Sequence, residues 1–253
     1  MNSSTETARE RFLAREQAFR DTFERHLDAG VEFICRDGIC IDPEVVIAPG
    51  ATILPGTILK GKTVIGAGCV IGPNSLLEDA VLGENIKFNA SQGRQCTIAE
   101  GAEIGPYVQL RPDSHIGKKV HIGDFVEIKN STIGEGTAVA HLTYIGDATV
   151  GKYCNFGCGV VFVNYDGEIK SRTEVGDYCF IGCNTNLVAP VRIGDGAYTA
   201  AGSTITEDVP PAALGIARAR QVTKEDWAEQ KLAAYISKKT GLAKSPSEGA
   251  KQY

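Results

Sequence analysis

The sequence predicts an all-β fold, a parallel β-solenoid in which short strands wind around one continuous core. Aliphatic residues recur every six positions, most are followed by glycine, and glycine is abundant at 29 of 253 residues while aromatic residues make up only 7%. Because six is a multiple of two, each aliphatic side chain faces the same side of a short strand, and the glycine suits a corner where a Cβ would be costly. Stacked turns then bury a shared core. The first run consists of Ile47, Ile53, Leu59, Ile65 and Ile71.

The repeat covers residues 38–209, with slips in spacing near residues 88–97 and 138–144. No α-helix keeps six-residue steps over such a length. Between Phe162 and Val175 the spacing is 13 residues instead of six, so seven extra residues leave the coil. They belong to the polar stretch NYDGEIKSRTE, residues 164–174. A polar loop that projects from a rigid scaffold is a common way to build a functional site.

A helix is expected before the solenoid, within a segment of residues 1–37. Residues 4–28 place four apolar side chains on one helical face, and Gly30 follows as a stop signal. We expect this helix to pack beside the first coil. Its apolar face consists of Phe12, Phe19, Phe23 and Leu27.

A second helix is expected after the solenoid, in an arm of residues 210–241. Its start is indicated by Thr223 and Asp226, which form a pattern like a capping box, and its end by Gly241. An apolar stripe on it consists of Ala228, Leu232, Tyr235 and Ile236. The last residues, 242–253, are expected to be disordered.

Composition narrows the class of function. The net charge of −5 argues against a general nucleic-acid binder, which needs a basic face. No stretch approaches the roughly 20 apolar residues that span a bilayer, and the polar N-terminus is not a secretory signal. We therefore expect a cytoplasmic protein without a membrane partner, whose eight cysteines are reduced thiols.

The segment HLTYIGD, residues 141–147, interrupts the apolar rhythm. His141 takes a place where the pattern predicts an aliphatic residue, and a side chain with a pKa near 6.5 can accept a proton at neutral pH. The other histidines, His26, His115 and His121, lie in no such motif and are expected at the surface.

Seven segments resemble one family closely. They are RPDSHIG, GDFVEIKNS, AHLTYIGDA, NFGCG, VNYDG-x-x-K, TNLVAPV and AAGSTIT. They are similar to the C-terminal half of the bacterial bifunctional UDP-GlcNAc pyrophosphorylase / glucosamine-1-phosphate acetyltransferase, a hexapeptide-repeat acyltransferase. The likeness runs from about residue 8 to about residue 227. It implies a left-handed parallel β-helix with coils of 18 residues, an exception to the usual crossover hand, and a homotrimer.

The sequence departs from that family in one large feature. No glycine-rich nucleotide loop precedes the solenoid, and the pyrophosphorylase half is missing. We therefore expect uridylyl transfer to be absent, with a separate pyrophosphorylase as a conceivable partner.

The resemblance implies transfer of acetyl from acetyl-CoA to the amine of glucosamine 1-phosphate, for UDP-GlcNAc synthesis. His141 matches the catalytic base, and Glu127 matches an acid that orients it. Asn164 would donate to the thioester oxygen as it becomes an oxyanion. By the same match, the phosphate would bind Arg111, Lys129 and Lys170, and the sugar would bind Tyr144 and Asn155. Arginine and lysine are the usual donors to such a dianion.

Acetyl-CoA, the only cofactor implied, would lie in a groove between neighbouring subunits, with Arg218 near its phosphates; no metal is implied. Cys183 stands where better-known members have serine, and Cys158 where they have alanine. The implied contact residues are Cys158, Asn164, Tyr165, Cys183, Ala201 and Arg218.

Two C-x3-C pairs invite a zinc interpretation. Cys154 and Cys179 are 25 residues apart, as are Cys158 and Cys183. That spacing equals one coil of 18 plus the seven loop residues, so the pairs should stack on successive coils. Their offsets place Cys154 and Cys179 inside the coil and the other two outside, which rules out one tetrahedral site.

Three alternatives stay open from the sequence. The acceptor could be another amino-sugar phosphate or a nucleotide-linked amino sugar. The chain could instead be a non-catalytic hexapeptide-repeat protein that binds a partner or has a structural role. A covalent route through Cys183 is the minor third alternative.

Overall fold

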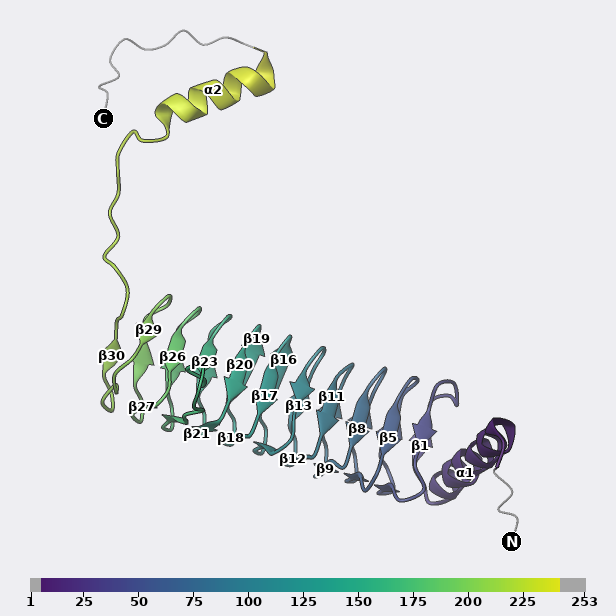
Figure 1. The fold of residues 1–253 in the computed structure, drawn as a ribbon. Helices are drawn as coiled ribbons and strands as arrows, with labels where there is room; N and C mark the ends of the chain where they lie inside the picture. The colour runs from purple at the N-terminus through teal and green to yellow at the C-terminus, as the bar shows by residue number, and fades with distance from the viewer. Residues whose placement is uncertain (1–5, 242–253) are drawn as a thin grey trace. The chain divides into compact units, whose positions relative to one another are not determined.

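The computed structural model describes residues 6–241, and it confirms the predicted left-handed parallel β-helix. The chain visits three parallel sheets in turn, so that each strand pairs with the strand three places along the sequence, except that β28 pairs with β30 (Figure 1). The sheets contain 11, 10 and 9 strands. Every coil is therefore a triangle whose three sides belong to the first, second and third sheet.

The first sheet contains β1 (Glu32–Phe33), β4 (Thr52–Ile53), β7 (Val70–Ile71), β10 (Lys87–Phe88), β13 (Glu103–Ile104), β16 (His121–Asp124), β19 (Ala138–His141), β22 (Asn155–Phe156), β25 (Phe180–Ile181), β28 (Tyr198–Thr199) and β30 (Leu214–Gly215). The second contains β2 (Cys40–Ile41), β5 (Ile58–Lys60), β8 (Leu76–Glu78), β11 (Gln92–Arg94), β14 (Gln109–Leu110), β17 (Glu127–Lys129), β20 (Tyr144–Gly146), β23 (Val161–Val163), β26 (Asn186–Val188) and β29 (Thr204–Ile205). The third contains β3 (Val46–Ile47), β6 (Val64–Ile65), β9 (Val81–Leu82), β12 (Cys96–Ile98), β15 (Ser114–Ile116), β18 (Ser131–Ile133), β21 (Ala148–Val150), β24 (Thr173–Val175) and β27 (Val191–Ile193).

The core consists of two inward positions on each side of the triangle. The repeat aliphatics, such as Ile53 and Leu59, are fully buried, and so is the small residue two places before each of them, such as Thr57. Buried hydroxyls need partners, and the Thr57 hydroxyl donates to the carbonyl of Leu54 at 2.7 Å. A column of large and a column of small side chains therefore fill each face.

The positions of the spacing slips differ partly from the prediction. The slip near residues 88–97 is confirmed, since inward residues there are five apart. The predicted slip near residues 138–144 does not occur, so that prediction is wrong: Val139 and Ile145 keep the six-residue step. Val139, aligned with Ile122, holds the aliphatic place, and His141 is an exposed corner residue two positions later. The shortened corners lie on either side of this segment.

The N-terminal helix α1 (Ala8–Asp28) packs against the first coil, as predicted. Thr7 caps it, since its hydroxyl accepts from the amide of Glu10 at 3.2 Å and its own amide donates to the Glu10 carboxylate at 2.7 Å. The ring of Phe23 lies 4.2 Å from that of Phe33 on the first strand. His26 is only 5% exposed at this contact, so the expectation of a surface residue is wrong.

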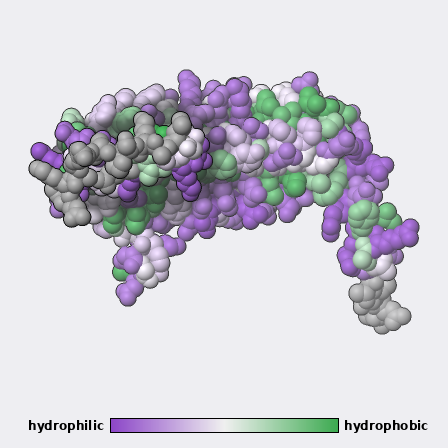
Figure 2. Space-filling view, turned by 90° about the horizontal axis from the view of Figure 1, so that it is seen from above, coloured by the Kyte–Doolittle hydropathy of each residue, from purple (hydrophilic) through white to green (hydrophobic). Residues whose placement is uncertain are grey.

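The solenoid ends later than expected. Leu214 pairs with Tyr198, so strand β30 continues the first sheet to Gly215, beyond the boundary at residue 209. Figure 2 shows one face of the molecule, with apolar side chains gathered over the N-terminal coils and mostly polar surface over the middle coils.

The chain divides after Arg218 into two units, and the second contains α2 (Glu229–Thr240). The predicted cap at Thr223 does not form: the helix begins after Ala228, because Asp226 adopts a φ of 57° that helices do not use. Gly241 ends the helix with a φ of 67°, as predicted. The expected disordered tail, 242–253, lies outside the described residues. Neither of the described helices is long and apolar enough to cross a membrane.

The buried His26 predicts a pH dependence of stability. Burial, and then the neighbouring charge of Arg25, lower the pKa of His26 below its ordinary value of about 6.5. Its Nε2 also lacks a hydrogen-bond partner among residues 6–241. The unfolded chain therefore binds this proton more readily than the folded chain. The contribution to stability is present above about pH 6.5 and is lost as the pH falls toward the lowered pKa.

We expect the thermal midpoint of the protein to fall between pH 7 and 5 more steeply than that of a His26→Gln variant. Thermal unfolding followed by circular dichroism across this range measures the difference. His115→Gln, at an exposed position, is the matched control and should keep the profile of the parent protein. Parallel profiles for the parent protein and His26→Gln would contradict the assignment.

Candidate functional site

The outward face of the second sheet bears a ladder of polar side chains. In a parallel stack, equivalent positions of successive coils lie in line. The position after the inward residue is occupied by Arg94, Arg111 and Lys129 on successive coils. The position before it is occupied by Gln109, Glu127 and Tyr144. The sheet therefore presents several of the predicted site residues side by side.

Arg111 and Glu127 form an ion pair on this face. Nη1 of Arg111 donates to Oε1 of Glu127 at 2.8 Å, and this hydrogen bond raises the pKa of Arg111. Tyr144 follows Glu127 in the same column on the next coil, so its side chain is on the same face as this ion pair. No hydrogen bond joins Glu127 to His141 in the described part of the chain. The orienting role predicted for Glu127 stays a prediction.

Asp147 organises the corner that follows this face. It is 8% exposed, and its Oδ1 accepts from Nδ2 of Asn130 at 2.6 Å while its Oδ2 accepts from Nδ2 of Asn164. Burial alone would raise its pKa, but the two amide donors and the charges of Lys129 and Lys170 outweigh burial and lower it. Asp147 is therefore an anionic centre among donors.

Sequence reasoning did not find Asp147 or Asn130. The available signal was the five-residue spacing from Ile128 to Ile133 and again from Ile145 to Val150. Two successive coils turn this corner one residue early, which stacks Asn130 directly on Asp147.

Lys129 and Lys170 lie together beside Asp147. The neighbouring ammonium group of Lys170, and then burial, lower the pKa of Lys129. Lys170 comes from the loop that leaves the coil after β23, where the chain bridges back so that Tyr165 pairs with Lys170 and the amide of Ser171 donates to the carbonyl of Asn164 at 2.9 Å. The charges of both lysines act on Asp147. Positive charge exceeds negative charge here, so the corner favours a further anion.

Gly146 allows the phenol of Tyr144 to join this cluster. A Cβ at Gly146 would lie 2.3 Å from the Tyr144 hydroxyl oxygen and 2.9 Å from Nδ2 of Asn164. The hydroxyl and the amide therefore meet over the glycine backbone. We call Arg111, Lys129, Tyr144, Asp147, Asn164 and Lys170 the cationic corner.

A second set of predicted residues lies along one edge of the solenoid, between the first and second sheets. These residues each stand two positions after an inward residue of the first sheet, and their carbonyls are joined to the next coil by hydrogen bonds. The Gly159 amide donates to the carbonyl of His141 at 3.3 Å, and the Gly202 amide to that of Cys183 at 2.8 Å. We call this set the histidine edge; it consists of His141, Cys158, Cys183 and Ala201.

His141 is exposed on this edge, and its ring makes no hydrogen bond within residues 6–241. Arg218 lies close to the same edge, since a Cβ on Gly202 would be 3.9 Å from its Cδ. Asn155 is on the outward face of the first sheet, between Ala138 and Phe180, and the exposed Tyr165 is in the loop. Tyr165 is bridged to Lys170 of the cationic corner. No hydrogen bond or ion pair joins His141, Asn155 or Arg218 to that corner within residues 6–241.

The cysteines lie where the repeat predicts. Cys154 and Cys179 are buried, Cys158 is half-buried and Cys183 is exposed. Four thiols on both sides of the wall cannot surround one ion. Residues 6–241 contain no cluster of three or more histidine, cysteine, aspartate or glutamate side chains placed to hold a metal.

The comparisons with known proteins agree with this architecture. The family described as bacterial transferase hexapeptide (six repeats) matches residues 44–79 and 172–207, and the GMPPB C-terminal domain matches residues 92–166. The chain belongs to the hexapeptide-repeat acyltransferase family. The predicted membership is therefore confirmed.

Two relatives show which branch of the family is similar. The bifunctional protein GlmU of Clostridium acetobutylicum is 53% identical over 208 residues, which is 82% of this chain and 46% of the relative. GlmU of Clostridium tetani is 54% identical over 206 residues, 81% of this chain and 45% of the relative. The chain thus spans about half the length of these relatives.

A solved structure resembles the chain more distantly. It is the Arabidopsis UDP-N-acetylglucosamine acyltransferase, which is 16% identical and has a TM-score of 0.42, covering 85% of this chain and 77% of that one. A likeness this weak gives no information on the site.

The role of Asp147 in the cationic corner can be tested by stability. Asp147→Ala would leave the amide of Asn164, itself 8% exposed, without its partner. A buried unsatisfied donor costs about 1–3 kcal/mol, so we expect the free energy of unfolding to fall by about that amount in denaturant titrations. Asp124→Ala, at an exposed corner position, is the control and should change it by less than about 0.5 kcal/mol. Equal effects of the two substitutions would contradict the role.

Proposed function

We propose that the chain transfers acetyl from acetyl-CoA to the amine of glucosamine 1-phosphate, giving N-acetylglucosamine 1-phosphate and CoA. The observation that carries the proposal is the cationic corner, where Arg111, Lys129 and Lys170 gather beside Tyr144 on a solenoid 53% identical to part of GlmU. The similarity covers only about half of the relative, so the support for this activity has to come from the residues of the site.

The cationic corner suits a sugar phosphate. Lys129 and Lys170 are close enough for their charges to act on each other, and neighbouring like charges favour an added anion. Arg111 can turn its remaining guanidinium donors toward the same anion, because only Nη1 is engaged with Glu127. Tyr144 offers a hydroxyl for the sugar next to the phosphate.

The acetyl transfer requires a base and an oxyanion donor. The neutral imidazole of His141 would accept a proton from the amine as its nitrogen attacks the thioester carbon. The C–N bond forms, the C–S bond breaks, and the CoA thiolate leaves and takes the proton back. The second N–H of the Asn164 amide, whose first is bound to Asp147, would donate to the developing oxyanion.

We propose that acetyl-CoA binds along the histidine edge in a homotrimer. Cys158, Cys183 and Ala201 continue the line of His141 toward Arg218, which offers a charge for the CoA phosphates. Within one chain His141 lies at the edge before the second sheet, whereas Lys129 lies at the far end of that sheet's strands. A neighbouring subunit would complete the site if its histidine edge lay opposite the cationic corner of the first subunit.

The base can be tested directly. We expect His141→Ala to lower kcat for CoA release with glucosamine 1-phosphate by about 10²–10⁴-fold, the usual contribution of general base catalysis. The thermal midpoint should stay constant, because the ring is exposed and makes no hydrogen bond in the described chain. His121→Ala, on the first sheet, is the control with unchanged kcat. A His141→Ala enzyme with normal turnover would refute the role.

The phosphate site can be tested separately. We expect Lys170→Ala to raise KM for glucosamine 1-phosphate about tenfold or more, since hydrogen bonds to charged groups are worth about 1.5–3 kcal/mol. KM for acetyl-CoA should be nearly unchanged. Lys152→Ala, an exposed lysine away from the corner, is the control. An equal rise in both KM values for Lys170→Ala would argue against a phosphate contact.

The acceptor is identified by comparing substrates at fixed acetyl-CoA. We expect glucosamine 1-phosphate to exceed free glucosamine, which lacks the anion. Faster acetylation of UDP- or dTDP-linked amino sugars would replace the proposed acceptor, and release of CoA with none of them would favour a non-catalytic protein.

A further inference from the structure

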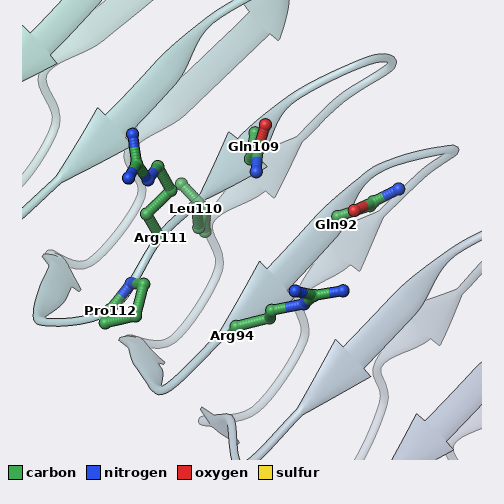
Figure 3. Close-up of a pocket in the computed structure, with 6 residues that line it drawn as sticks. All are labelled: Gln92, Arg94, Gln109, Leu110, Arg111 and Pro112. Atoms are coloured by element: carbon green, nitrogen blue, oxygen red, sulfur yellow. The ribbon is translucent and has the colours of Figure 1, made fainter.

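A hollow lies on the second sheet, one coil before the cationic corner (Figure 3). Its volume is about 330 Å³. It is lined by the outward side chains of two neighbouring coils and by the turn that follows them. The lining residues are Gln92, Arg94, Gln109, Leu110, Arg111 and Pro112.

The polar side chains that line the hollow are two positively charged guanidinium groups and two neutral amides. The guanidinium groups of Arg94 and Arg111 come from neighbouring coils, and the amides of Gln92 and Gln109 lie in the second column beside them (Figure 3). The carboxylates that pair with the arginines, Glu78 at 3.4 Å and Glu127 at 2.8 Å, are outside the lining. Exposed ion pairs of this kind are weak, so an anion in the hollow can compete for both arginines.

The hollow is continuous with the proposed phosphate site. Arg94, Arg111 and Lys129 occupy one column on three successive coils, and neighbouring strands are about 4.8 Å apart. Arg111 belongs to both sites. Two phosphate groups that share a bridging oxygen could therefore contact Arg111 and Arg94 together, whereas a single phosphate needs only the cationic corner.

We propose that this hollow binds the diphosphate and nucleoside of a nucleoside diphosphate sugar, whose sugar lies at Tyr144. The inference rests on the proposed function, because it takes Arg111 as the shared phosphate contact. The diphosphate bridges Arg111 and Arg94, and the amides of Gln92 and Gln109, which can both donate and accept, face the base or ribose. Such a ligand occupies the sugar-phosphate site and competes with glucosamine 1-phosphate. The enzyme is then inhibited by the compound class that nucleotidyl transfer makes from its product.

Isothermal titration calorimetry on the full chain tests the binding without turnover. The probe is UDP-N-acetylglucosamine, titrated alone and against saturating glucosamine 1-phosphate. We expect binding that is abolished by the sugar phosphate. Arg94→Ala should weaken the binding of UDP-N-acetylglucosamine about tenfold or more and leave that of glucosamine 1-phosphate unchanged.

Two further variants sharpen the test. Arg192→Ala removes an exposed arginine that is ion-paired with Glu174 at 2.7 Å on the third sheet, and it should change neither affinity. Gln92→Ala should weaken UDP-N-acetylglucosamine but not inorganic pyrophosphate, because only the former has a nucleoside.

The outcomes separate this inference from the proposed function. Equal affinity of the Arg94→Ala variant and the parent protein for UDP-N-acetylglucosamine would overturn the inference, as would binding that glucosamine 1-phosphate does not displace. A protein that acetylates no amino sugar but binds UDP-N-acetylglucosamine through Arg94 would refute the proposed function and support the hollow. Full acetyltransferase activity without binding of UDP-N-acetylglucosamine would support the proposed function and overturn the inference about the hollow.

Discussion

Parallel stacking of the coils is the constraint on which the rest of the structure depends. Because each strand is hydrogen-bonded in register with the strand one coil away, residues at equivalent positions form straight columns. Columns that face the core must contain apolar or small side chains. Columns that face outward can contain many kinds of side chain. The histidine edge is one such outer column, and the cationic corner is built partly from two others, so the scaffold fixes much of their spacing before any ligand arrives.

The site forms where the repeat is broken. Two successive corners are one residue short, and this brings Asn130 onto Asp147. The long loop leaves the solenoid after the next strand at the same corner, which adds Asn164 and Lys170. A buried carboxylate would be costly without donors, and here it holds two amides and attracts two ammonium groups. Asp147 thus offsets part of the positive charge at this corner.

The sequence predicted the architecture well because a six-residue period has one solution for packing. The inward places of Cys154 and Cys179 followed from arithmetic alone and are confirmed. The predicted place of His141 was wrong. Periodicity cannot tell which corner loses a residue when the corners of two successive coils are short. Asp147 and the burial of His26 were missed for a related reason, as both depend on contacts between coils or with the helix rather than on local pattern.

The separation of base and cations within one chain follows from the same geometry. His141 stands at the corner before the second sheet, and Lys129 at the corner after it, so one flat face lies between them. A substrate phosphate and a reacting amine are parts of one small sugar, and they must be held at close range. A rigid prism cannot fold its own edges together. A second prism placed against the first would set one edge opposite the other, which is why the proposed mechanism includes self-association.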